Sequence, residues 1–428
     1  MIDLWGHFSA RVPGSDLVAV TPRFSKRVLP RTITATEILV CDASGRLTEG
    51  RGELPSSFEQ DLSVYRSSEH KACVFGAPRF AMAAAIAGFE LRALTHMESI
   101  TGFGLGSNLA TATAVHERGI GVWAAGSDVY DALTSLYHLE YLAQANSVVA
   151  SDRGVHGIAR EDSDRLWSQF RGHHHYHEFF DSLDPGPLEH PYERFRRQAD
   201  DPLKAAIAWS CRALWERGTL VAFLEHISHR APDPRHFYMS ASKNFRDIGV
   251  EDICVLDYEA NHIAGPKPPG FKWFHAQLLR ERKDAVAVVH THDVHGRAYA
   301  LGSRKPVGSY RVGLAIGTGP VPQYGRCDLI VDPQVRRATL DALADGPVVH
   351  EIGHGTDFVA DNLEKSTVDA IQREAFLAMD SLTRRYGEPQ ALSQGSLTRI
   401  KAEERAAEDW WWFYAAEVGA PRRSAAGL

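Results

Sequence analysis

The chain has 428 residues, of which 44% are hydrophobic and 24% charged, and its formal net charge is −7. This length suits two domains of about 200 residues, and the acidic balance excludes nucleic acid and anionic membranes as expected partners. The N-terminal residues carry no secretory signal pattern, the longest apolar run is too short to span a bilayer, and the five cysteines form no CxxC pair. We therefore expect a cytoplasmic protein with reduced thiols.

The two halves of the chain repeat one another. The matching segments, in order, are 6–11 with 225–230, 36–42 with 251–257, 55–58 with 268–271, and 71–75 with 286–290. Because order and spacing are both kept, we predict a tandem duplication. Residues 1–180 would form the first domain, the proline-bearing segment 181–200 a linker, and residues 201–428 the second domain.

The second half alternates between helical and strand patterns, which predicts an α/β layered fold. Helices are expected at 201–217, 273–282, 333–344 and 363–386. Strands are expected at 219–227, 237–240, 253–257, 285–290, 312–316 and 329–331.

The valine-rich strand at 285–290 delivers two histidines at its end, His290 and His292. Residues i and i+2 of a strand face the same side, so both imidazoles can converge on one ion. Imidazole is a common ligand of zinc, iron and manganese. The same spacing also arises at strand ends without a metal, so a third ligand has to support this interpretation.

A rival motif lies at residues 350–354, where His350-Glu351-Ile-Gly-His354 matches HExxH. In zinc proteases this motif is a helix whose two histidines bind the metal. Gly353 and Gly355 disfavour a helix, and Val348-Val349 after Gly-Pro favours a strand that enters a turn. A zinc metalloprotease is therefore the alternative, not the preferred interpretation.

Residues 201–390 resemble the class II aldolase/adducin family, whose metal-dependent enzymes include fuculose-phosphate aldolase. The resemblance is carried by Ser228-x-Arg230 on a strand after a helix, an aspartate-ended strand, Phe274-His275, His290-Thr-His292 and His354-Gly355. It implies an α/β protein of two tandem class II aldolase-like α/β/α layered domains. It also implies that His290, His292 and His354 bind one divalent ion per chain, with zinc in first place and iron or manganese as alternatives.

The first half resembles the same domain without its ligands. Phe75 and Ala77 stand opposite His290 and His292, and Ala125 is expected opposite His354. The resemblance implies a small-molecule substrate and a homo-oligomer, a dimer of tandem chains that form a pseudo-fourfold ring.

The chain departs from the family pattern at the acid/base glutamate, where Phe271 stands, with Phe58 expected opposite it in the first half. The catalytic candidates are therefore Lys272, Glu351 and Tyr414. The substrate-binding candidates, which replace the family's phosphate loops or flank the metal strand, are Glu225, His226, Ser228, Arg230 and His295. Without loops suited to a dianion, a non-phosphorylated hydroxy- or keto-acid is the expected substrate.

A divalent ion on three neutral imidazoles stabilises an enediolate. We therefore predict a metal-dependent lyase that performs aldol cleavage or condensation, or decarboxylation. The alternatives are a non-catalytic adducin-like scaffold, the HExxH zinc metalloprotease, and an iron-dependent oxygenase on the same fold.

Overall fold

The computed structural model describes residues 6–23, 33–87, 89–94, 105–106, 114–117, 121–150, 155, 157–159, 161–162, 165, 201–218, 225–302, 305–310, 312–319, 321–325, 330, 332–385, 387–402, 406–418 and 420. The chain divides into two compact units, residues 1–150 with 157–172, and residues 151–156 with 173–428. Each unit is described by itself. Within the described ranges no helix has both the length and the apolar character to cross a membrane.

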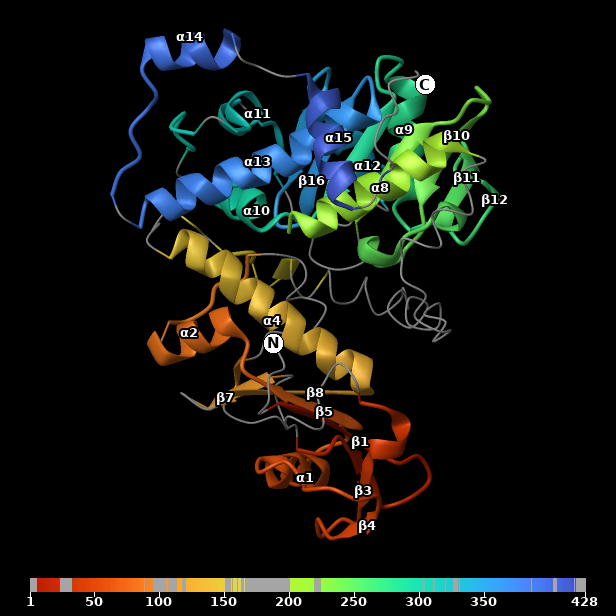
Figure 1. Ribbon diagram of the computed structural model, residues 1–428, viewed down its shortest axis with the longest axis vertical. Helices are drawn as coiled ribbons and strands as arrows, with labels where there is room; N and C mark the ends of the chain where they lie inside the picture. Colours follow the sequence, from red (N-terminus) through yellow and green to blue (C-terminus); the bar gives the residue numbers. More distant parts are fainter. Residues whose placement is uncertain are drawn as a thin grey trace. The chain divides into compact units, whose positions relative to one another are not determined.

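The N-terminal unit is built on an eight-stranded sheet in the order β4-β3-β2-β1-β5-β8-β7-β6, antiparallel except for the parallel pair β6 and β7 (Figure 1). Its strands are β1 (His7–Arg11), β2 (Val18–Val20), β3 (Leu39–Cys41), β4 (Leu47–Glu49), β5 (Ala72–Gly76), β6 (Leu105–Gly106), β7 (Ala114–Glu117) and β8 (Gly121–Gly126). Its helices are α1 (Phe58–Ser67), α2 (Arg79–Ala87) and α4 (Val129–Val149), with a 3-10 turn at Ala35–Glu37.

Alternation along the central strands separates two apolar layers in this unit. Cys73 and Phe75 of β5 pack with α1, whereas Ala72 and Val74 pack with α2 and α4. The sheet therefore lies between helices on both faces, an α/β/α arrangement as expected.

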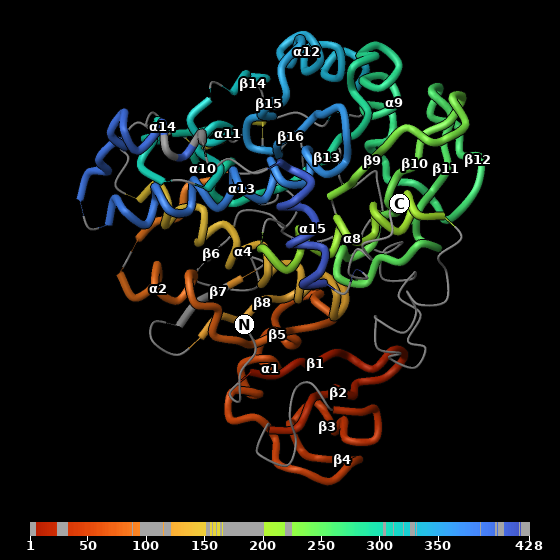
Figure 2. The backbone as a smooth tube through the Cα atoms, turned by 45° about the horizontal axis from the view of Figure 1, so that its top comes forward, coloured from red at the N-terminus to blue at the C-terminus, as the bar shows by residue number. Residues whose placement is uncertain are grey.

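The C-terminal unit repeats this topology, with the strand order β12-β11-β10-β9-β13-β16-β15-β14 (Figure 2). Its strands are β9 (His226–Arg230), β10 (His236–Ser240), β11 (Ile253–Asp257), β12 (His262–Ala264), β13 (Ala287–Thr291), β14 (Gln323–Tyr324), β15 (Val348–Glu351) and β16 (Gly355–Ala360). Its helices are α8 (Pro202–Glu216), α9 (Lys272–Glu281), α10 (Val294–Leu301), α11 (Leu314–Thr318), α12 (Pro333–Leu343), α13 (Leu363–Thr383), α14 (Gln394–Ala402) and α15 (Ala407–Glu417), with 3-10 turns at Phe245–Asp247 and Val250–Asp252.

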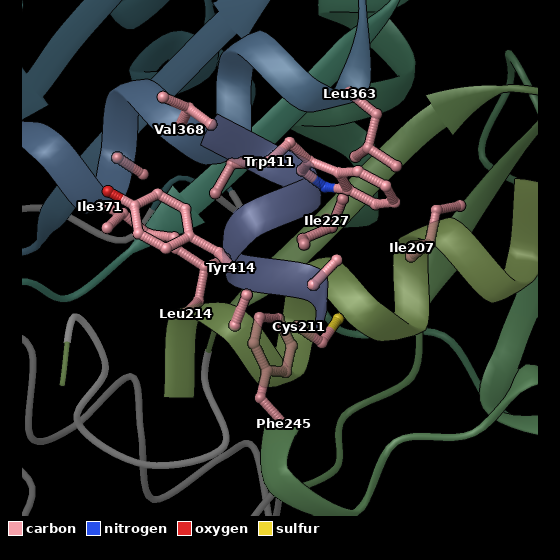
Figure 3. Packing of buried hydrophobic residues seen from close by; sticks show 14 of the residues in the cluster. Ile207, Cys211, Leu214, Ile227, Phe245, Leu363, Val368, Ile371, Trp411 and Tyr414 are labelled. Atoms are coloured by element: carbon pink, nitrogen blue, oxygen red, sulfur yellow. The ribbon is translucent and has the colours of Figure 1, made fainter. Parts of the chain in front are cut away.

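One face of this sheet packs on an apolar cluster contributed by α8, α13 and α15. Figure 3 shows Tyr414 of α15 beside Leu214 of α8 and Ile371 of α13, and Trp411 of α15 near Leu363 of α13. The indole Nε1 of Trp411 donates to Ser210 Oγ at 2.8 Å, so its buried N–H is satisfied. Residues next to Ile227 along β9 point to the opposite face, which carries α9.

Most expected elements of the C-terminal unit are confirmed to within a few residues. The expected strand at 312–316 is wrong, because helix α11 (Leu314–Thr318) begins there after Gly313, which has φ +70°. Gly317 packs directly against the ring of Phe376 on α13. A short apolar run does not distinguish a strand from a buried helical turn. Residues 219–224, residues 329 and 331, and the expected linker 181–200 lie outside the described residues.

The strand registers correct two correspondences between the halves. Ala72 pairs with Gly126 and Ala287 with Ala360, so Gly126 corresponds to Ala360 and not to Gly355. Helices α4 and α13, each 21 residues long, then start at equivalent positions after their N-caps. Ala125 is therefore not the counterpart of His354; the counterpart is residue 120, an isoleucine that lies outside the described residues.

With this register, one more pair of matching segments appears in the two halves. Residues 115–121, VHERGIG, correspond to residues 349–355, VHEIGHG. The match of Ala125 with His354 rests on the similar tripeptides Gly126-Ser-Asp128 and Gly355-Thr-Asp357, which lie at different places in the sheet. Likewise, the N-caps of α1 and α9 are Ser57 and Phe271, so Ser57 and not Phe58 stands opposite Phe271.

Candidate metal centre

Three buried histidines of the C-terminal unit converge on one point. His290 ends β13, His292 follows it, and His354 comes from the turn between β15 and β16. One nitrogen of each lies within 4.8 Å of the other two, and His290 Nε2 is 3.4 Å from His292 Nε2. None of the three side chains is more than 3% exposed. The three sequence-predicted ligands are thus brought together.

Two glycines explain why the 350–355 segment is a strand and a turn. Gly353 has φ +71°, which lets the chain reverse and return His354 toward β13. A Cβ on Gly355 would lie 2.6 Å from the Thr291 carbonyl oxygen and 2.8 Å from His290 Cε1. Only glycine therefore allows β16 to run so close to the histidine pair.

Each of the three histidines faces a carboxylate through its Nδ1 atom. His290 Nδ1 lies 2.9 Å from Asp357 Oδ1, His292 Nδ1 3.5 Å from Glu225 Oε1, and His354 Nδ1 2.5 Å from Glu351 Oε2. A carboxyl group at Nδ1 favours the tautomer with its proton on Nδ1, so the lone pair lies on Nε2. The three imidazoles are oriented as a metal-binding set would need.

Electrostatics in the cluster favour a neutral His292. Burial lowers the pKa of His292, with the charge of His290 acting in the same direction. Burial opposes ionisation of Asp357, yet His290 and its hydrogen bond hold the pKa of that carboxyl below its usual range. Burial and the neighbouring Asp357 raise the pKa of Glu351 well above its ordinary value. The donor set, three imidazole nitrogens backed by carboxyl groups, fits a divalent cation.

His226 forms an aromatic wall beside the three histidines. Its ring stacks on His290, with centroids 4.9 Å apart, and on Phe271, with centroids 5.2 Å apart. Phe271 also lies 5.5 Å from the ring of His354. The residue that replaces the acid/base glutamate is therefore part of this wall, next to the ligands.

The known proteins that resemble this chain identify its family. The model of the "Class II Aldolase and Adducin N-terminal domain" matches residues 2–147 and 205–379. The chain belongs to the class II aldolase/adducin family. The family domain occurs twice, which confirms the duplication and the fold class expected from the sequence.

Decarboxylases are among the relatives of this family member. The chain is 33% identical to a 3,4-dihydroxyphthalate decarboxylase of Arthrobacter keyseri, over 39% of this chain and 73% of that enzyme. It is 29% identical to the enzyme of the same name from Rhodococcus jostii, over 41% and 78% of the two chains. An aldolase II superfamily protein from Pseudomonas syringae has a similar structure, with a TM-score of 0.45, 16% identity, and coverage of 56% and 96%. The chain is thus a lyase-type enzyme of the family, as expected.

The HExxH alternative is wrong for this family member. His350 lies on strand β15, its Nδ1 is 2.8 Å from Thr356 Oγ1, and its Nε2 is 3.0 Å from the Arg373 guanidinium. Successive strand residues face opposite sides, and Glu351 Oε2 lies 2.5 Å from His354 Nδ1, so the preceding His350 points away from the cluster. The two histidines of the motif have separate surroundings.

Among the substrate-binding candidates, Glu225 and His226 lie at the metal cluster. The other three have protein partners: Ser228 Oγ lies 2.6 Å from His275 Nδ1, Arg230 Nε donates to the Ala285 carbonyl at 2.8 Å, and His295 Nδ1 lies 2.6 Å from Glu374 Oε1. A substrate contact for any of them stays a prediction.

Of the catalytic candidates, Glu351 lies at the cluster through His354. Lys272, the first residue of α9 and next to Phe271, holds its Nζ 4.8 Å from the Trp273 ring centroid. Tyr414 packs in the apolar cluster on the other face of the sheet, against Trp410 and Arg217 (Figure 3). Sequence reasoning missed Asp357. Its signal is its position two residues after Gly355 on β16, where it pairs with His290.

Proposed function

We propose that the C-terminal copy is a metal-dependent decarboxylase that acts on a non-phosphorylated hydroxy- or keto-acid. His290, His292 and His354 would hold one divalent ion, with zinc our first choice. The observation that carries the proposal is the set of three buried imidazoles with one nitrogen of each within 4.8 Å of the other two, each ring facing a carboxyl group through Nδ1.

When bound, a divalent ion would act as a Lewis acid on adjacent substrate oxygens and stabilise the enediolate that remains after carbon dioxide leaves. The other contributions to the reaction would come from side chains of the protein itself. Phe271 puts an apolar ring where the family's acid/base glutamate would stand. Decarboxylation needs no base to remove a proton from carbon, so loss of that glutamate fits decarboxylation better than aldol chemistry.

The aromatic wall formed by His226 and Phe271 also acts on the substrate carboxylate that leaves as carbon dioxide. Burial beside Phe271 disfavours a charged carboxylate more than neutral carbon dioxide, so the wall favours the departure step. The carbon must then receive a proton. Our candidate donor is Lys272, which follows Phe271 at the start of α9, with Glu351 as the second candidate.

The names of the relatives narrow the substrate class. 3,4-Dihydroxyphthalate carries two adjacent hydroxyl groups and carboxylates on one aromatic ring. We propose that the substrate of this chain likewise offers a pair of adjacent oxygens close to a carboxylate. We further propose that the protein is cytoplasmic and that two tandem chains pair in a pseudo-fourfold ring, since family members form oligomers.

The test uses the purified full chain, elemental analysis, and a panel of hydroxy- and keto-acids that includes 3,4-dihydroxyphthalate. We expect one divalent ion per chain and release of carbon dioxide. His292→Ala should lose the ion and reduce turnover by about 1,000-fold or more, because both Lewis-acid catalysis and substrate orientation are lost.

His229→Ala is the matched control, since His229 lies on the neighbouring strand and its Nδ1 bonds a backbone carbonyl at 2.6 Å. It should keep the ion and the activity. A chain with two ions, or a His292→Ala variant that retains metal and turnover, would contradict the proposal. A metal-free, inactive wild-type chain would favour the scaffold, and turnover that requires oxygen would favour the iron-dependent oxygenase.

A further inference from the structure

A second cluster of reactive side chains lies in the N-terminal copy, where the metal ligands are missing. His7 on β1 and Asp61 on α1 are buried, with His7 Nε2 2.8 Å from Asp61 Oδ2. On the other side of the imidazole, Ser57 Oγ lies 3.4 Å from His7 Nδ1. The three residues form a hydroxyl–imidazole–carboxylate series.

Hydrogen bonding fixes the tautomer of His7. Asp61 Oδ2 also accepts a hydrogen bond from Ser9 Oγ at 2.6 Å, as a carboxylate acceptor would. The His7 Nε2–H then donates to the same oxygen, which leaves the Nδ1 lone pair facing the hydroxyl of Ser57. A nucleophile, a base within reach of it, and a third group that orients the base define this class of site, and the nucleophile–base distance is often looser without substrate.

The three side chains of the series differ in burial. His7 and Asp61 are fully buried, whereas Ser57 is only half-buried and its neighbour Ser56 is exposed. Asp61 Oδ1 is buried and has no hydrogen-bond partner within the described part of the chain. Its unneutralised charge would stabilise the imidazolium that forms when His7 takes a proton. Ser57 stands at the N-cap position of α1 but makes no side-chain capping hydrogen bond there, so its hydroxyl is not held by the helix.

The series is specific to the N-terminal copy. The equivalent positions in the C-terminal copy are Phe271, His226 and His275, which carry neither a hydroxyl nor a carboxylate. There, His226 stacks on Phe271 instead of facing a nucleophile. The N-terminal copy has therefore lost the metal ligands and gained a different set of reactive groups at the neighbouring positions.

We propose that the N-terminal copy carries a second catalytic site, an acyl-transfer site for small carboxylic esters or thioesters. Ser57 is the nucleophile, His7 the general base, and Asp61 the residue that positions His7. Ser57 Oγ attacks the acyl carbon as its proton moves to His7 Nδ1. The bond to the leaving alcohol or thiol breaks, and that group receives the proton from His7. Water then hydrolyses the acyl-serine by the same route, releasing the acid and restoring Ser57.

The experiment treats the full chain with a fluorophosphonate probe and with p-nitrophenyl acetate. A metal centre can itself hydrolyse activated esters, so His292→Ala serves as the metal-free background. We expect stoichiometric labelling at Ser57 in this background and a burst of about one nitrophenolate per chain. Ser57→Ala should abolish both, while Ser56→Ala, its exposed neighbour, should leave both unchanged.

His7→Gln should slow labelling by about 100-fold or more, the usual contribution of a general base. Since His7 is buried, the thermal unfolding of the His7→Gln variant is measured alongside its labelling. If this variant is unstable, the labelling of Ser57→Ala alone tests the proposal. An unlabelled wild-type chain, or equal labelling of wild type and Ser57→Ala, would overturn the proposal. Neither result bears on the metal content, which reports separately on the C-terminal centre.

Discussion

The two copies of the domain have the same strand order but fill one position of the sheet differently. In the C-terminal copy, β13 and β16 pair His290 with Asp357, which are hydrogen-bonded at 2.9 Å. In the N-terminal copy, β5 and β8 pair Phe75 with Trp123, whose ring centroids lie 4.3 Å apart. A polar histidine–aspartate pair and an aromatic pair therefore occupy the same place in one architecture.

The difference separates the requirements of the fold from those of the chemistry. The backbone ladder holds either pair, because the strand register is set by main-chain hydrogen bonds and by the apolar residues that face the helices. The phenyl ring of Phe75 needs no hydrogen-bond partner, whereas the imidazole and carboxylate have to satisfy each other's hydrogen bonds. The site chemistry is thus carried by few side chains on a frame that does not depend on them.

The largest effect on metal binding is expected from alanine substitutions at the equivalent glycines Gly355 and Gly121, which test the difference between the two copies. A Cβ on Gly355 would meet the Thr291 carbonyl oxygen at 2.6 Å, and one on Gly121 would meet Phe75 Cε2 at 2.2 Å. Each alanine variant should lose about 1–3 kcal/mol of stability through overpacking. Gly355→Ala should also displace the ligand histidines and weaken metal binding by about 100-fold, the cost of a misplacement of about 1 Å.

Gly121→Ala is the matched control and should bind metal like the wild type. Isothermal titration of the metal-stripped chain measures both affinities, and thermal unfolding measures both stabilities. Equal loss of metal affinity in the two variants would mean that the copies do not divide the chemistry as proposed.

A smaller effect is expected for the carboxylate behind His290. Asp357→Asn removes the negative charge behind this imidazole and one of its two acceptor oxygens, and loss of such a carboxylate weakens metal binding by about 10- to 100-fold. Asp128→Asn is the comparison in the N-terminal copy, because Asp128 is the residue that sequence alignment alone sets opposite Asp357. Asp128 accepts from the Asp131 amide at 2.8 Å as the N-cap of α4, so this change should leave the metal affinity unaltered. Competition with a chelating dye measures both, and equal affinities for Asp357→Asn and wild type would refute a positioning role.

The smallest expected effect is a dependence of the stability of the C-terminal copy on pH. Burial lowers the pKa of His275 from 6.5 to about 3, so below pH 6.5 the unfolded chain takes up a proton that the folded chain refuses. The free energy of unfolding should therefore fall as the pH drops, by about 2 kcal/mol between pH 6.5 and 5 from this residue. Hydrogen exchange of the metal-stripped chain across this interval measures the loss copy by copy. A His275→Gln variant with the same pH slope as the wild type would show that His275 is not its source.

The sequence alone indicated the duplication, most of the helices and strands, and the three metal-ligand candidates. Short sequence patterns predict these features. The two-residue period of a strand places His290 and His292 on one side, and glycines around His354 favour a turn over a helix. The first copy is expected to lack the ligands, and that expectation stays a prediction, with residue 120 in place of Ala125 as the counterpart of His354. The helix at 314–318 was not predicted, because an apolar run of five residues suits a strand equally well.

Only the tertiary structure decided which distant residues meet. The carboxylates Asp357, Glu225 and Glu351 face the histidines because strands from separate parts of the chain pair in one register, and that register is not encoded in any short segment. The same holds for His7 and Ser57, which lie 50 residues apart in the chain and meet between β1 and α1. Side-chain type can be read from sequence, whereas the approach of two side chains depends on long-range packing, and chemistry needs both.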